Sequence, residues 1–293
     1  MHQTVPTFDE TLAAFLRTLE GGNKSAATIM AYRSDLAQFV AFLRETNCTV
    51  TGPADVTRED VAEYLSSLAD RGITGKSRAR KLSAIREYYR FLEARGVVEK
   101  SPTLGIETPK KERNGRTTLR PDEYTQLLAL AGGNPRDYAI MQVFLQTGIR
   151  VSELCALTRE DIDLAERTLR VARGKGMQER TIELEPKGIK AFRSYLTVRP
   201  QSLYEELFLN YQGEPLSDRG VRKMLAKYLK QAGITKPISP HSLRHTFATR
   251  KAERGISAFQ LKEWLGHSRL DTTQIYVHMS KTNARKQMEA TSL

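Results

Sequence analysis

A break in periodicity at residues 101–117 is the sequence feature that most constrains the fold of this chain. The segment SPTLGIETPKKERNGRT contains two prolines, two glycines and a basic cluster, and it follows neither a helical nor a strand repeat. Such a composition is typical of an exposed linker. Because 293 residues are enough for two domains that each bury a core, we expect one domain at residues 1–108, a basic linker at 109–117 and a second domain at 118–293.

The first domain is predicted to be entirely helical. Apolar residues recur at helical spacing in four stretches, and none of these alternates between apolar and polar residues as a half-buried strand does. Three of the stretches end near Gly21, Gly72 and Gly96, where glycine favours a helix C-terminus. Thr57 and Asp60 have the spacing of a capping box, although Asp replaces the usual Glu.

The second domain is predicted to be mostly helical with a small antiparallel β-sheet. The segment TLRVARGKGMQERTIELEP, at residues 168–186, indicates two short strands around a glycine-rich turn. Helical patterns occupy residues 120–132, 137–148, 186–196, 217–233, 239–255, 257–267 and 270–280. The predicted fold class is therefore mainly α.

The net charge of +12 favours a polyanionic partner. Residues 1–108 contain 14 Lys and Arg and 14 Asp and Glu, so the whole surplus lies in residues 109–293. Nucleic acid is the partner that this balance favours, and an acidic membrane surface is the alternative.

Other sequence features favour a reducing cytoplasmic location. No apolar run approaches the roughly 20 residues that a membrane-spanning helix needs. The N-terminal residues lack the basic and then apolar order of a secretory signal. Cys48 and Cys155 are the only cysteines, which excludes a disulfide framework and a cysteine-rich zinc site.

A basic patch lies within the neutral first domain. Between positions 71 and 90 the basic residues are Arg71, Lys76, Arg78, Arg80, Lys81, Arg86 and Arg90. A solvated helix face is one interpretation of this run, and a face that follows DNA is the other. The basic linker residues Lys110, Lys111 and Arg113 are suited to lie along the same phosphate backbone. The predicted DNA-binding residues are Lys76, Arg78, Arg80, Lys81, Lys110, Lys111 and Arg113.

The stretch PHSLRHTFATR places two histidines around an arginine. His241 and His245 are four residues apart, as two zinc ligands on a helix are, but no glutamate lies between them to act as a base. The cationic Arg244 between them disfavours a metal ion, and His245 alone also fits a packed interior histidine. His241 and Arg244 together suit an anionic group such as a phosphodiester.

Four further residues could complete a phosphate site, and three of them also have a simpler explanation. Arg150 either faces a phosphate or forms a surface pair with Glu153. Lys175, in the RGKG turn, is otherwise a solvated turn lysine. His267 is followed nine residues later by Tyr276, which is otherwise a helix-packing aromatic.

The order of these residues resembles the motif of the tyrosine recombinase, or phage integrase, family. That motif is Arg, a hairpin Lys, HxxR, a GH dipeptide and then Tyr; the matching segments are TGIRVSEL, HSLRHTFAT and LGHSRLDTTQIYVH. The resemblance covers nearly the whole chain, since the first domain resembles the family's SAM-like core-binding domain. The length, without an arm-binding module, is most similar to the Xer branch (XerC/XerD-type) or to a small mobile-element integrase. The family implies a C-shaped clamp on DNA.

The resemblance also implies a role for each motif residue. Tyr276 attacks phosphorus to give a 3′-phosphotyrosyl link, with His241 as general base or orienting donor and Lys175 as general acid. Fixed cations replace metal ions, so that no cofactor is expected. Arg150 and Arg244 hold the non-bridging oxygens.

His267 would donate a further hydrogen bond to the phosphate, and Glu153 would orient Arg150. Asp161 and Asp163 have no acidic partners in the sequence and are expected to be a solvated lead-in to the hairpin.

The implied partner is double-stranded DNA with a specific recombination site. The family acts as a tetramer, here either a homo-tetramer or a hetero-tetramer with a paralogous recombinase, with an accessory regulator as a further partner. The residues after Tyr276 are either a docking tail or a frayed end. The expected function is strand exchange through a Holliday junction, for chromosome dimer resolution or mobile-element integration and excision, at the nucleoid. A type IB topoisomerase-like enzyme and a non-catalytic DNA-binding protein on the same fold are the alternatives.

Overall fold

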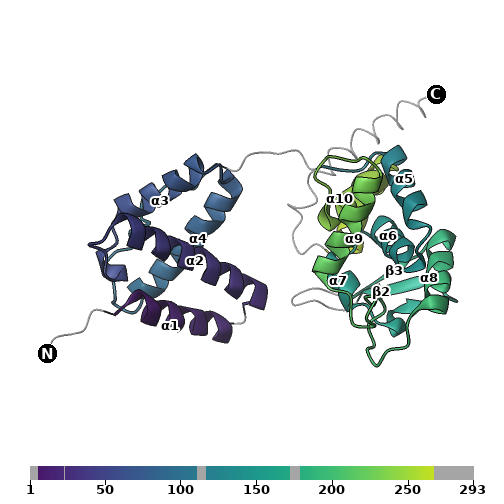
Figure 1. Ribbon diagram of the computed structural model, residues 1–293, viewed down its shortest axis with the longest axis horizontal. Helices are drawn as coiled ribbons and strands as arrows, with labels where there is room; N and C mark the ends of the chain where they lie inside the picture. Colours follow the sequence, from purple (N-terminus) through teal and green to yellow (C-terminus); the bar gives the residue numbers. More distant parts are fainter. Residues whose placement is uncertain (1–5, 23, 111–116, 172–178, 267–293) are drawn as a thin grey trace. The chain divides into compact units, whose positions relative to one another are not determined.

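The chain folds into two compact units, Met1–Asn114 and Gly115–Leu293, in the computed structural model (Figure 1). The structure describes residues 6–22, 24–110, 117–171 and 179–266. Within these residues, no helix combines the length and the apolar character needed to cross a membrane. The clamp that the two units are expected to form on DNA stays a prediction.

The described part of the first unit contains four α-helices, which confirms the prediction from periodicity. These are α1 (Phe8–Gly21), α2 (Ala26–Thr46), α3 (Arg58–Asp70) and α4 (Gly75–Glu93), with a 3₁₀ turn, η1, at Pro53–Asp55. The predicted capping box of α3 is present: the Thr57 hydroxyl accepts from the Asp60 N–H, and the Asp60 carboxylate accepts from the Thr57 N–H.

An ion cluster lies inside this helical unit. Asp35 of α2 is only 1% exposed, and it accepts a 3.0 Å hydrogen bond from the ammonium group of Lys81 on α4. Lys81 is itself buried and also donates to Gln38. Arg80 pairs with the other carboxylate oxygen of Asp35. The pairs attach α2 to α4 and satisfy a buried carboxylate.

The beginning of the predicted linker is not an exposed tether. Pro102 and Thr103 are buried, and Ile106 packs against the apolar core of the first unit. The guanidinium of Arg86 on α4 donates to the Ile106 carbonyl and to the Thr108 hydroxyl. The exposed character that the composition of 101–117 suggested is therefore wrong for these residues, which precede the expected linker at 109–117, because Ile106 packs against an existing core.

The described part of the second unit is helical around a small sheet, as predicted. Its helices are α5 (Pro121–Ala131), α6 (Pro135–Thr147), α7 (Val151–Ala156), α8 (Pro186–Val198), α9 (Asp218–Gln231), α10 (Pro240–Glu253) and α11 (Ala258–Leu265). A 3₁₀ turn, η2, lies at Arg159–Asp161. The three described strands are β1 (Ile162–Asp163), β2 (Thr168–Val171) and β3 (Arg180–Glu183), in antiparallel order β1-β2-β3.

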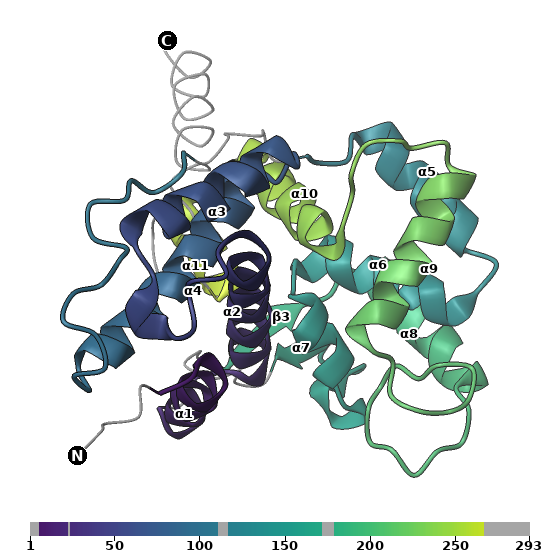
Figure 2. The ribbon, with the colours of Figure 1, turned by 60° about the vertical axis from the view of Figure 1, so that its left-hand side comes forward.

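Helix α6 forms the centre of the second unit. Most of its side chains are buried, and α5, α8 and α10 pack around it (Figure 2). Leu169 and Ile182 pair across the β2–β3 register and are both buried in the same core. One face of the sheet therefore packs against the helices. This packing fixes the position at which β3 begins.

The isolation of Asp161 and Asp163 in the sequence suggested a solvated lead-in to the hairpin, which is wrong for Asp161 and is confirmed for Asp163, whose side chain is exposed. Asp161 is 5% exposed, accepts from the N–H and hydroxyl of Thr158, and pairs with Arg170 at 3.1 Å. Asp163 lies in β1 and accepts two backbone N–H groups of the following turn. Both carboxylates thus shape the approach to the hairpin.

Candidate active site

Arg150 is held at the junction of α6 and α7. Helix α6 ends at Thr147, and its C-cap residue Gly148 adopts the left-handed conformation with φ of 61°. Ile149 is fully buried, and Arg150 then forms the N-cap of α7, with its N–H donating 2.8 Å to the Glu153 carboxylate. This short path fixes the Arg150 backbone on both sides.

Arg244 lies in the second turn of α10 and is 4% exposed. Ser239 caps the helix and Pro240 opens it, within the helical pattern that was predicted at residues 239–255. The guanidinium donates 2.8 Å to the carbonyl of Gly148 and 2.5 Å to the carbonyl of Leu265. It therefore connects the end of α6 to the end of α11.

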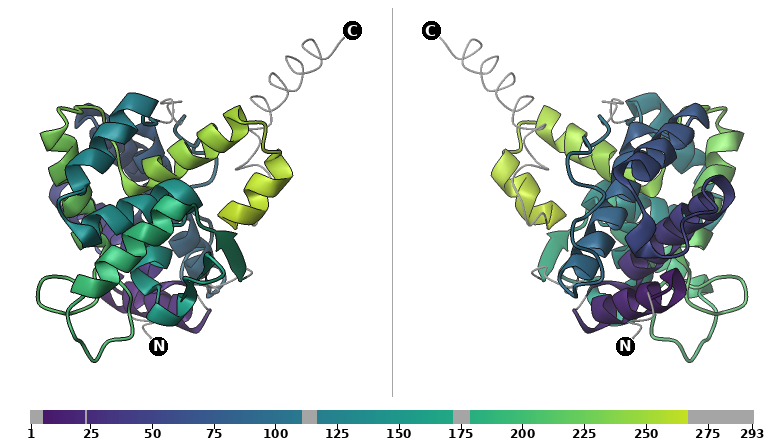
Figure 3. Two further views of the ribbon diagram at one scale, coloured as in Figure 1. Left: turned by 90° about the vertical axis from the view of Figure 1, so that its right-hand side faces the viewer. Right: turned by 90° about the vertical axis from the view of Figure 1, so that its left-hand side faces the viewer.

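The C-terminus of α11 collects three arginines of the described chain. Besides Arg244, Arg150 donates 3.2 Å to the Gly266 carbonyl, and Arg180, the first residue of β3, donates 2.7 Å to the Trp264 carbonyl. The last carbonyls of a helix lack partners within it and carry its negative partial charge, so that cations are favoured there. Figure 3 shows α10 and α11, in yellow-green and yellow, as neighbours in this unit.

Glu153 is the carboxylate at the centre of this cluster. Its side chain is 7% exposed, and it accepts from the side chains of Arg150 (2.9 Å) and Arg180 (2.8 and 3.2 Å). Burial acts to raise the pKa of Glu153. The hydrogen bonds and charges of Arg180 and Arg150 outweigh burial, so the pKa lies below its ordinary value. Glu153 is therefore ionised and oriented by two guanidinium groups.

The two histidines of α10 lie beside Arg244 in sequence. His241 is exposed and His245 is half-buried, with ring centroids 4.5 Å apart at an interplanar angle of 82°. No group of three or more His, Cys, Asp or Glu in the described parts of the chain is placed to hold a metal ion. The two imidazoles thus lie against each other on the first turns of α10, the helix that also carries Arg244.

Three of the predicted catalytic residues, Lys175, His267 and Tyr276, lie outside the described residues. The structure brings Arg150, Glu153 and Arg244 together and places His241 on the first turn of α10, while the catalytic roles of all these residues stay predictions. The described chain ends at Gly266, directly before His267 in the sequence, with a left-handed φ of 60°.

The predicted DNA-binding residues differ in exposure. Lys76, Arg80 and Lys110 are exposed and Arg78 is half-buried, while Lys111 and Arg113 lie outside the described residues. The prediction that Lys81 contacts DNA is corrected. Its ammonium group is buried against Asp35 and Gln38, so it is not presented to a phosphate backbone. We therefore leave Lys81 out of the proposed DNA contacts.

Sequence reasoning missed Arg180. Its side chain is 9% exposed and contacts two helices of the second unit, α7 and α11. The available signal was its place two residues before the buried Ile182, because alternate residues of a strand share a face. An arginine on the same strand face as a core residue indicates that its guanidinium has a buried polar partner.

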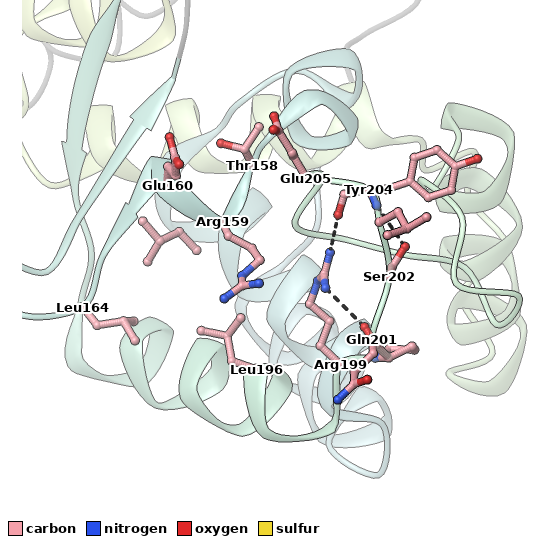
Figure 4. Close-up of a pocket in the computed structure, with 13 residues that line it drawn as sticks. Thr158, Arg159, Glu160, Leu164, Leu196, Arg199, Gln201, Ser202, Tyr204 and Glu205 are labelled. Carbon is pink, nitrogen blue, oxygen red and sulfur yellow. Dashed lines mark hydrogen bonds between the residues drawn. The ribbon is translucent and has the colours of Figure 1, made fainter.

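A cavity of about 980 Å³ lies in the second unit but contains none of these site residues. It is lined by η2, the end of α8 and the segment that follows it (Figure 4). Arg199 holds that segment together through hydrogen bonds to the Pro200 and Tyr204 carbonyls. The cavity is thus separate from the arginine cluster.

Comparison with known families gives matches to both units. The phage integrase family matches residues 117–283, and the phage integrase N-terminal SAM-like domain matches residues 12–96.

Individual relatives match over most of their length. The chain is 35% identical over 276 residues to tyrosine recombinase XerC of Bacillus pumilus, with 90% of each chain covered. It is 38% identical over 271 residues to tyrosine recombinase XerD of Staphylococcus haemolyticus, covering 89% of this chain and 91% of that one. A lambda integrase, solved as a tetramer bound to a Holliday junction, shares the fold with a TM-score of 0.78 at 21% identity. The match covers 94% of this chain and 78% of that one.

Proposed function

This chain belongs to the phage integrase family, and from this premise we propose that it is a site-specific tyrosine recombinase. The observation that carries the proposal is that Arg150 and Arg244 are held at the same place in the fold. They are far apart in sequence, and both guanidinium groups are fixed on the C-terminal carbonyls of α11. Two guanidinium groups held in advance at one place suit the charge that develops on a phosphodiester under attack.

In the proposed reaction, the oxygen of Tyr276 forms a bond to phosphorus and the bond from phosphorus to the 5′-oxygen breaks. His241 takes the tyrosine proton, and Lys175 gives a proton to the leaving 5′-oxygen. Help with ionisation is needed because a phenol has an ordinary pKa of about 10. The 3′-phosphotyrosyl link conserves the bond energy, so a 5′-hydroxyl can reverse the step without ATP.

Arg150 and Arg244 stabilise the transition state from the non-bridging oxygens. Removal of one such donor typically lowers a rate by about 10²–10³-fold. Glu153 keeps Arg150 in place through its backbone and side-chain bonds, and His267 donates a further hydrogen bond to the phosphate.

The proposed substrate is double-stranded DNA with a specific recombination site, and strand exchange passes through a Holliday junction. The lambda integrase structure, a tetramer on such a junction, supports a tetramer for this chain too. That tetramer contains either four copies or two copies each of this chain and a paralogue, with an accessory regulator. We place the protein at the nucleoid, in chromosome dimer resolution or mobile-element integration and excision.

Covalent trapping tests the chemistry. The protein is incubated with DNA that carries a nick near the exchange point, in the presence of EDTA, and is run on a denaturing gel beside Tyr276→Phe. A slow, protease-sensitive band from the wild type alone is expected. A band that persists with Tyr276→Phe would show that another residue is the nucleophile.

A plasmid with two sites separates recombination from the topoisomerase alternative. A recombinase gives deletion or inversion products, whereas a topoisomerase-like enzyme only relaxes supercoils. A non-catalytic DNA-binding protein gives neither product and no covalent band.

A further inference from the structure

We propose that Arg180 is a positioning residue for strand cleavage, which acts by sharing Glu153 with Arg150. The inference rests on the proposed function, because the step that it affects is the attack on the scissile phosphate. Arg180 itself is not expected to touch the DNA.

All three nitrogens of the Arg180 guanidinium donate hydrogen bonds. Nη1 and Nη2 donate to the two carboxylate oxygens of Glu153 at 3.2 and 2.8 Å, and Nε donates 2.7 Å to the Trp264 carbonyl. A planar guanidinium fixes the carboxylate plane through two parallel bonds, which an ammonium group cannot do. The orientation of Glu153 is therefore set by β3 and by α11 as well as by α7.

The charges explain why Glu153 needs a second cation. If Arg150 were the only partner of the buried Glu153 carboxylate, the two charges would cancel and the Arg150 guanidinium would be engaged by Glu153 alone. With Arg180 bound as well, one carboxylate serves two guanidinium groups, and the cluster keeps a positive charge before Arg244 is added. Arg150 can then bind both Glu153 and an anionic phosphate.

The position of Arg180 also connects the parts of the site. It opens β3, five residues after Lys175 in the sequence, and it holds the Trp264 carbonyl in the last turn of α11, three residues before His267. A Cβ atom on Gly266 would lie 3.0 Å from Nη1 of Arg180, so that glycine leaves room for the guanidinium. Arg180 thus fixes the start of β3, the start of α7 and the end of α11 together.

Single-turnover cleavage of the nicked DNA tests the inference, with DNA affinity measured separately. Arg180→Met is expected to lower the cleavage rate by about 10- to 100-fold, less than the loss of a direct donor, with an almost unchanged dissociation constant. Arg180→Lys keeps the charge without the fork and is expected to recover part of the rate. Arg170→Met is the matched control, since Arg170 on β2 also pairs with a buried carboxylate, that of Asp161.

A double-mutant cycle with Glu153→Gln shows whether Arg180 acts through that carboxylate. The effect of Arg180→Met is expected to shrink in the Glu153→Gln background, because the charge to be shared is gone. Equal effects in both backgrounds, a wild-type rate for Arg180→Met, or the same loss in Arg170→Met would overturn the inference. Failure of the wild type itself to form the covalent band would instead overturn the proposed function.

Discussion

The Nη1 atom of Arg244 donates a hydrogen bond of 2.8 Å to the carbonyl oxygen of Gly148, which lies 96 residues earlier in the chain. Gly148 turns the chain from α6 towards Arg150 in a left-handed conformation, with φ of 61°, and its carbonyl accepts from Arg244. One backbone turn therefore places both arginines of the proposed phosphate site.

Gly148→Ala is expected to destabilise the protein by about 2 to 4 kcal/mol, from a left-handed backbone and an overpacked core. A Cβ atom at this position would collide with the ring of Phe247 and lie 3.1 Å from Leu265. Urea unfolding measures the change. Gly133→Ala is the control, because nothing lies within 4 Å of its added Cβ atom and its φ is not positive. Similar midpoints for the two variants would contradict this account of Gly148.

Lys76→Met is expected to weaken DNA binding without loss of stability. Lys76 is exposed at the first turn of α4, so one phosphate contact fewer should reduce the slope of log K against log salt by about 1. Fluorescence anisotropy at several salt concentrations measures this slope. An unchanged slope would remove Lys76 from the proposed contacts.

Lys81→Met is expected to behave in the opposite way. Lys81 is buried against Asp35, and its loss leaves that carboxylate with Arg80 as its ion partner. The cost to folding is expected to be about 1–3 kcal/mol, with the salt slope unchanged. A reduced slope with wild-type stability would restore Lys81 to the DNA-binding face.

The contrast between these two lysines shows what the sequence could predict. Periodicity located most helices, and Thr57 marks a helix start that the structure confirms. The same pattern could not separate Lys76 from Lys81, since burial depends on a partner on another helix, 46 residues from Lys81.

Short elements were missed for a related reason. Helix α7 has six residues and β1 has two, which is too few for a repeat to show. In the site, Arg150, Glu153 and Arg244 were found by their order along the chain. Arg180 was not, because its role depends on the Glu153 carboxylate and the Trp264 carbonyl, which only the fold brings to it.

The two cysteines are expected to react at very different rates. Cys48 is exposed. Burial, together with the charge of Asp218, raises the pKa of the Cys155 thiol to about 11, so that little thiolate is present near neutral pH. Titration with Ellman's reagent should show one fast thiol in the native protein and a second after unfolding. Cys48→Ser should abolish the fast phase; a fast phase that remains would mean that Cys155 is accessible and ionised.

Acid is expected to destabilise the second unit through Glu153. Its pKa in the folded protein lies below the ordinary value of 4.5, because the bonds from Arg180 and Arg150 outweigh burial. The unfolded chain therefore binds the proton more tightly, so the contribution of Glu153 to stability is fully present above pH 4.5 and is lost as the pH falls through the folded-state pKa.

Urea unfolding midpoints of the wild type and Glu153→Gln, measured from about pH 7 to about pH 3, test this linkage. The wild type should be the more stable protein at neutral pH, and the difference should shrink as the carboxylate is protonated. Lys76→Met, which changes an exposed lysine of the first unit, serves as a control for general acid effects. A difference between wild type and Glu153→Gln that stays constant down to the lowest pH would show that Glu153 is not held as an ion by its two arginines.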